Sequence, residues 1–98
     1  MIPLRNLKNS DDQRVLDGFV MDEITRETMK ALNLKFMRSS KNRDTDRKKA
    51  IARFGKTVNL KDYAIHHCYN GLVGLAPIEI HKSINHRGYF YRLKYAEC

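Results

Sequence analysis

The four histidines of this chain are the residues whose type and spacing could do chemistry. They are His66, His67, His81 and His86, and they all lie within 21 of the 98 residues. Neutral imidazole is a common metal ligand, and near pH 7 it is also a common general base. Three imidazoles around one ion with an open position are typical of a catalytic metal site, which leaves the fourth histidine as a base. The alternatives are ordinary core or surface histidines, or a purely structural zinc site.

A strand, a turn, a second strand and a helix are expected to position these histidines. The residues of the run Tyr63–Cys68 predict a strand, and Asn70-Gly71 is a strong hairpin signal. Leu72–Ala76 is the expected partner strand. Pro77 suits the first turn of a helix, which we expect to continue to about Ile84.

This arrangement constrains which histidines can meet. Neighbouring residues on a strand point to opposite faces, so only one of His66 and His67 should face the following helix. His81 lies inside that helix and His86 follows five residues later, about 140° further round an ideal helix. Both could bind one metal only if the helix ends between them and the chain turns back, which Asn85 and Gly88 favour.

The stretch Ile65–Gly88 resembles the ββα-metal core of the HNH endonuclease superfamily, closest to the His-His branch of polymorphic bacterial toxin domains. The resemblance covers about 25 of the 98 residues. It rests on three motifs, His66-His67, Leu72-Val73-Gly74-Leu75-Ala76-Pro77 and His81-x4-His86-x-Gly88. It implies a metal-dependent endonuclease that hydrolyses phosphodiester bonds of nucleic acid with weak sequence specificity, with DNA favoured over RNA.

The resemblance also implies a role for each residue. His66, His81 and His86 would be the metal ligands of one divalent ion, with zinc favoured and magnesium or nickel as alternatives. His67 would be the general base that takes a proton from the attacking water. Asn70 is the nearest counterpart of the asparagine that orients this base in many HNH enzymes, although backbone geometry alone also explains an Asn-Gly turn.

The toxin setting follows from the resemblance only. It implies action in the cytoplasm of the cell where the nuclease works, with secretion or delivery into that target cell. It also implies an acidic immunity or inhibitor protein in the producing cell, because complementary charge favours binding to a basic nuclease.

The excess positive charge is concentrated in residues 41–61. The chain has a net charge of +8, and this segment has eight basic residues against Asp44 and Asp46. A focused basic segment is typical of a polyanion-binding protein, whereas a solvated helix face is the alternative. A membrane surface is disfavoured because the segment has few apolar residues at helical spacing. The candidate nucleic-acid-binding residues are Arg43, Arg47, Lys48, Lys49, Arg53 and Lys56, with Arg87 and Arg92 near the histidines.

The length predicts one domain, residues 1–98, of α+β class. A helical, basic platform over 1–60 would precede a ββα-metal core and C-terminal segment over 62–98. A capping box predicts a helix from Asp11, and a second helix is expected over Asp22–Met37. A third would be capped by Asp44 or Thr45 and end at Gly55.

Several classes are excluded. No apolar run approaches the roughly 18–20 residues of a membrane-spanning helix, and the first residues lack the features of a secretory signal. The two cysteines, Cys68 and Cys98, form no C-x-x-C pair and are expected to be reduced thiols. Two other functions stay open: a non-catalytic, zinc-stabilised nucleic-acid-binding module, and a phage or mobile-element protein that binds another protein through its helical half.

Overall fold

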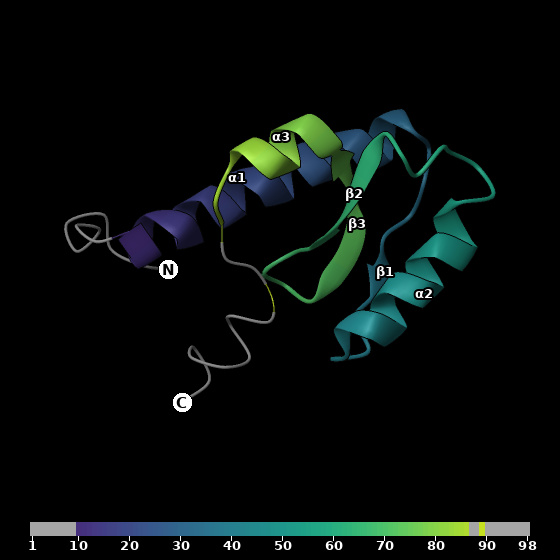
Figure 1. Cartoon of the computed structure of the whole chain (residues 1–98), viewed down its shortest axis with the longest axis horizontal. Coiled ribbons are helices and arrows are strands. Elements are labelled where there is room, and N and C mark those ends of the chain that lie inside the picture. Colours follow the sequence, from purple (N-terminus) through teal and green to yellow (C-terminus); the bar gives the residue numbers. More distant parts are fainter. Residues whose placement is uncertain (1–9, 87–88, 90–98) are drawn as a thin grey trace.

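A computed structural model describes residues 10–86 and residue 89 (Figure 1). Within this part the protein combines helices with a small antiparallel sheet, as the predicted α+β class requires. The elements in chain order are α1 (Ser10–Ala31), β1 (Met37–Arg38), α2 (Arg43–Phe54), β2 (Tyr63–His67), β3 (Leu72–Pro77) and α3 (Ile78–Ser83). Among the described residues, no helix has the length and apolar content needed to cross a membrane.

The sheet is built around the predicted hairpin. β3 lies in the centre and pairs with both β2 and β1, so the strand order is β1-β3-β2. In the hairpin, His66 is opposite Gly74 and His67 is opposite Val73. Gly71 has a φ of +90° in the turn, a conformation that favours glycine. The hairpin signal of the sequence is therefore confirmed, together with the two strands beside it.

The first two expected helices are one continuous helix, α1. The prediction of a break near Asp22 is wrong because the buried side chains Val15, Met21, Thr25 and Met29 continue on the same side of the helix through this point. This stripe packs along the sheet, and Gly74 of β3 lies so close that a Cβ there would be 2.9 Å from the Thr25 methyl group.

The predicted extension of the helix to Met37 is also wrong. The helix ends at Ala31, and Asn33 adopts a φ of 55°, in the left-handed region that stops a helix. The chain then enters β1, an edge strand with no clear sequence signal because it has only two residues. Residues 1–60, expected to form a helical platform, therefore also contribute a strand.

α2 begins at Arg43, earlier than predicted. Its N-cap is Asn42, whose side chain accepts a hydrogen bond from the Thr45 N–H at 3.0 Å, and not Asp44 or Thr45. Its end at Gly55 agrees with the prediction. The buried residues Asp46, Ala50 and Phe54 recur every four positions, so one face of α2 is directed into the protein.

The main core lies between α1, α2 and the sheet. It consists of Met29, Met37, Ala50, Phe54, Val73 and Leu75. α2 and the central strand β3 each contribute two of these side chains, and α1 and β1 each contribute one, so burial of this cluster fixes both helices relative to the hairpin. The hairpin in turn presents the histidines.

Candidate functional site

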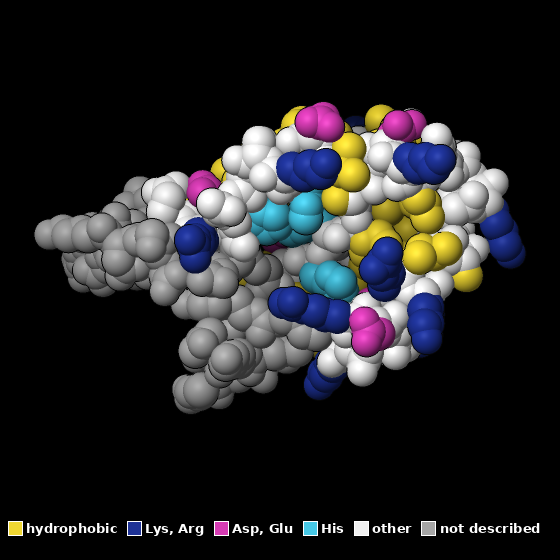
Figure 2. Space-filling model, viewed as in Figure 1, with side chains coloured by type: hydrophobic (Ala, Val, Ile, Leu, Met, Phe, Trp, Pro, Cys, Tyr) yellow, Lys and Arg dark blue, Asp and Glu magenta, His cyan; other side chains and the backbone are white. Residues whose placement is uncertain are grey.

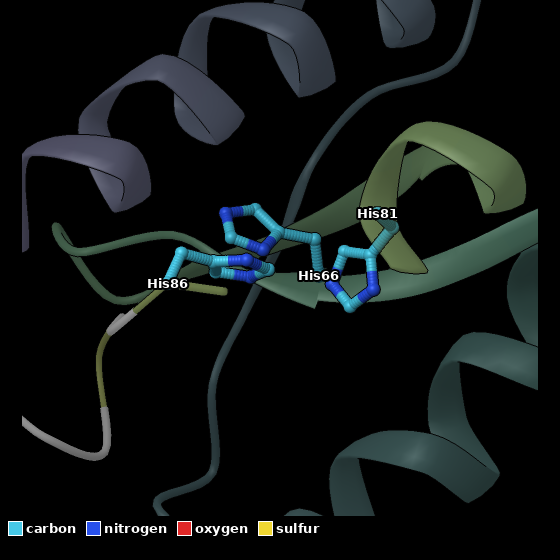
Figure 3. A group of neighbouring side chains, drawn as sticks. All are labelled: His66, His81 and His86. Atoms are coloured by element: carbon cyan, nitrogen blue, oxygen red, sulfur yellow. The ribbon is translucent and has the colours of Figure 1, made fainter. Parts of the chain in front are cut away.

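Three of the four histidines converge at one point (Figure 3). His66 comes from β2, His81 from α3, and His86 from the segment after α3. Their ring centroids are 4.7–5.6 Å apart, and one ring nitrogen from each lies within 4.8 Å of the others. We call these residues the histidine group. The sequence prediction that they share one site agrees with this geometry.

The end of α3 is what allows His86 to join the group. α3 stops at Ser83, and Ile84 is extended, with φ −111° and ψ 114°. The chain therefore leaves the helix between His81 and His86. The sequence requires such an end if both histidines are to bind one metal. The His86 Nδ1 is 2.8 Å from the Ile84 carbonyl oxygen. Because a carbonyl only accepts, Nδ1 carries the proton and Nε2 offers the lone pair that a metal needs.

Burial favours the neutral form of His81 and His86. Burial, together with the neighbouring His86 and His66 rings, lowers the pKa of His81 to about 4. Burial also lowers the pKa of His86. Neutral imidazole is the form that binds metal ions, so no proton has to leave His81 or His86 at pH 7.

The donor set fits a zinc-like ion. Nitrogens bound to tetrahedral zinc lie about 3.4 Å apart, given Zn–N distances of about 2.0–2.1 Å. The nitrogens of the histidine group lie within 4.8 Å of one another, so a modest contraction would bring them into range. Three nitrogen donors also leave a fourth position for water or substrate, or for another protein ligand.

Asp22 of α1 is a second neighbour of His66 that the sequence did not indicate as a site residue. Its Oδ1 is 2.7 Å from the His66 Nε2, and its Oδ2 accepts a hydrogen bond from the Tyr69 N–H at 3.1 Å. When Nε2 donates to Asp22, Nδ1 is the nitrogen that can bind a metal, in the carboxylate–histidine–metal arrangement.

Asp22 and His66 also form a group with Cys68. Their potential ligand atoms lie within 4.8 Å of one another. Cys68 is a buried free cysteine, in agreement with the prediction for this residue, whereas Cys98 lies outside the described residues. Burial raises the pKa of the Cys68 thiol, and the charge of Asp22 adds to the effect, so the thiol is protonated. A metal on Cys68 would have to displace this proton.

His67 points to the other side of β2, toward α2. Its Nε2 is 3.1 Å from Oδ2 of Asp46, a side chain with no solvent exposure, while the His67 side chain is 17% exposed. Burial lowers the pKa of His67, although the hydrogen bond and the charge of Asp46 oppose this. The neutral form required of a general base therefore predominates at pH 7.

A groove of about 490 Å³ lies in front of His67. Arg43 and Arg47 of α2 line it together with Tyr63 and Ile65 of β2. Of the predicted nucleic-acid-binding residues, these two arginines are the ones beside the candidate base. A second groove, of about 530 Å³, lies on the other side of α2 and is lined by Lys49, Arg53 and Lys56, together with Arg38, Met37 and Ala52.

The remaining predicted residues are dispersed. Lys48 is exposed on α2. Asn70 is exposed in the hairpin turn, where its Oδ1 accepts a hydrogen bond from the Leu72 N–H at 3.1 Å. This bond accounts for its residue type by turn geometry, and its catalytic role stays a prediction. Arg87 and Arg92 lie outside the described residues.

Figure 2 shows that histidine side chains reach the surface on one face of the protein, with Lys and Arg side chains around them. This face therefore presents imidazole and cationic side chains close together. Comparisons of the chain with protein-family models, with curated proteins and with solved structures find no match.

Proposed function

We propose that this protein is a metal-dependent endonuclease of the ββα-metal type, which hydrolyses phosphodiester bonds of nucleic acid, with DNA favoured over RNA. The observation that carries the proposal is the divergence of two adjacent histidines. His66 joins the histidine group on one side of β2, and His67 faces a groove lined by arginines on the other side. Delivery into a target cell and an acidic immunity partner stay predictions.

The divergence suits hydrolysis of a phosphodiester. In an in-line displacement, the attacking and leaving oxygens lie on opposite sides of the phosphorus. A base and a charge-stabilising centre therefore have to approach the phosphate from different directions. A divalent ion held by the histidine group would stabilise negative charge on the phosphate and on the leaving oxygen. His67 would take the proton of the attacking water.

The arginines beside His67 would hold the flanking phosphates. Arg43 and Arg47 line the same groove as His67, and guanidinium groups can bind phosphate oxygens through two parallel hydrogen bonds. Such contacts bind the backbone without reading bases, so cleavage should depend weakly on sequence.

Cleavage of supercoiled plasmid and of structured RNA tests the proposal. Each substrate is incubated with Mg²⁺, Mn²⁺, Zn²⁺ or Ni²⁺, with and without chelator, beside the variant His67→Ala. Lys82→Ala is the matched control, because Lys82 is an exposed side chain of α3. We expect metal-dependent cleavage that His67→Ala loses by about 10²–10⁴-fold and Lys82→Ala retains. Cleavage that is equal in His67→Ala and in the unchanged protein, or no cleavage with any metal, would refute the proposal.

A zinc-stabilised, non-catalytic nucleic-acid-binding module is the second candidate. The observation that favours it is the position of Asp22 and Cys68 next to His66, because a further protein ligand would close the metal site. X-ray absorption of the zinc-loaded protein separates the two candidates. Sulfur in the first coordination shell, or four protein ligands without water, would favour the structural module, and three nitrogens with a light exchangeable ligand would favour the nuclease.

A further inference from the structure

The carboxylate of Asp46 is a buried polar group that the proposed catalytic scheme has not yet used. It is fully buried. Its Oδ1 accepts hydrogen bonds from the N–H and the hydroxyl of Ser40 at 2.7 and 2.6 Å, and its Oδ2 accepts one from the hydroxyl of Ser39 at 2.6 Å. His67 approaches the same Oδ2.

We propose that Asp46 is the positioning residue for the general base His67, holding its ring by Nε2 so that Nδ1 is the nitrogen that accepts the proton. This inference rests on the proposed function. It assigns a role in the reaction to a residue of α2, 21 positions before His67 and outside the ββα stretch.

The tautomer follows from the chemistry of the contact. An ionised carboxylate only accepts hydrogen bonds, so the His67 Nε2, 3.1 Å from it, has to carry the ring proton. The lone pair of the neutral ring is then on Nδ1. Burial alone would raise the pKa of Asp46, but the hydrogen bonds of Ser39, Ser40 and His67 outweigh it and hold the pKa below its usual value. The carboxylate is therefore ionised across the neutral range.

The serines make the carboxylate rigid. Three short hydrogen bonds from Ser39 and Ser40 fix both oxygens, and α2 fixes the backbone of Asp46. A base whose ring is held from behind by a fixed acceptor keeps its orientation through the reaction. In hydrolysis, the water oxygen would bond to phosphorus as its proton moves to Nδ1. The bond from phosphorus to the leaving oxygen would break, and that oxygen would be protonated from solvent. The negative charge of Asp46 would stabilise the resulting imidazolium.

A purely structural role is the competing explanation, because the same hydrogen bonds hold the turn before α2. The two roles differ in what they predict for the ring of His67. A structural Asp46 affects folding and leaves the tautomer of a folded variant unchanged. A positioning Asp46 determines the tautomer and the turnover rate, with little effect on metal affinity or substrate affinity.

The primary test is ¹⁵N NMR of the His67 side chain in the metal-free protein at pH 8, assigned by comparison with His67→Ala. The Nε2–H tautomer is expected. A dominant Nδ1–H tautomer in the unchanged protein would overturn the inference without any variant of Asp46, and independently of whether nucleic acid is cleaved.

The second test compares Asp46→Asn with Asp62→Asn, which makes the same charge change at an exposed position. Asp46→Asn is expected to lose the Nε2–H preference and to lower kcat for plasmid cleavage by about 10²–10⁴-fold. KM and zinc affinity should stay within threefold of the unchanged protein, and Asp62→Asn should keep kcat. A folded Asp46→Asn protein with kcat within threefold of the unchanged protein would refute the role.

If Asp46→Asn does not fold, Ser39→Ala decides the question. This variant removes one structural hydrogen bond of the carboxylate and keeps the contact to His67. It should lower the melting temperature, while the Nε2–H tautomer is retained because the contact between Asp46 and His67 remains. Loss of the tautomer preference in a folded Ser39→Ala protein would show that the turn, and not the carboxylate, orients the ring.

Discussion

Replacing His81 with alanine tests the candidate metal centre directly, because this histidine is one of the three residues of the histidine group. Structural zinc sites with four protein ligands bind with about 10–16 kcal/mol, or about 2.5–4 kcal/mol for each ligand. Loss of one ligand should therefore weaken zinc binding by about 10²–10³-fold. The ring is partly buried in α3, so its removal should have only a small effect on the metal-free fold.

Thermal unfolding converts this loss into a measurable shift. At a free zinc concentration of 100 times Kd, binding stabilises the unchanged protein by about 2.7 kcal/mol. For a domain of this size, that is a rise in Tm of about 10–20 °C. If the Kd of His81→Ala is 100-fold higher, the same zinc concentration stabilises it by only about 0.4 kcal/mol, a rise of about 2–3 °C.

The assay is a melting curve with buffered zinc and with chelator, for the unchanged protein, His81→Ala and Lys82→Ala. The neighbouring Lys82 is exposed on α3, so its variant should keep the full zinc-dependent rise. Equal rises in all three proteins would show that zinc binds elsewhere and would refute the assignment of His81 as a ligand.

Four further outcomes are expected. Asp22→Asn should weaken zinc binding by about 10–100-fold in calorimetry, because this carboxylate orients a ligand; unchanged affinity would exclude that role. Gly74→Ala should destabilise the fold by about 1–3 kcal/mol in urea unfolding, since its Cβ would lie 2.8 Å from the Phe36 ring, and a neutral result would show that the ring moves aside. Metal-free protein should lose stability as the pH falls from about 6.5 toward 4, measured by urea unfolding. In this range the unfolded chain binds protons that the buried, low-pKa histidines of the folded state do not, and a flat profile would contradict the pKa assignments. Reversing the charges of Arg47, Lys48 and Lys49 together should make the slope of log K against log salt for plasmid binding less steep by up to about 2.7. An unchanged slope would place the nucleic acid elsewhere.

Local signals account for the elements that the sequence predicts well. Asn70-Gly71 specifies its turn through backbone conformation, and Pro77 directly precedes α3. Gly55 ends α2 as expected. The convergence of the histidine group was also predictable, because a hairpin followed by a short helix returns the chain to its starting strand. In each case the information lies within a few residues of the feature that it determines.

The two carboxylates were not predictable in this way. Asp22 contacts His66 across 44 positions, and Asp46 contacts His67 across 21 positions. Both residues lie near expected helix starts, where acidic residues are common because they interact favourably with the helix dipole. That local explanation is sufficient for each residue, so nothing in the spacing indicated that either one is directed toward a histidine.

These two contacts change how the helical half relates to the site. The charge of the sequence predicts only that this half is a basic platform that binds phosphate. In the structure, α1 and α2 lie on opposite sides of β2, and each gives one carboxylate to one of two adjacent histidines. A carboxylate fixes which nitrogen of an imidazole carries the proton, so each helix determines which nitrogen its histidine offers. Two neighbouring residues of identical type would thereby receive different tasks, His66 as a metal ligand and His67 as a base, because different helices hold them.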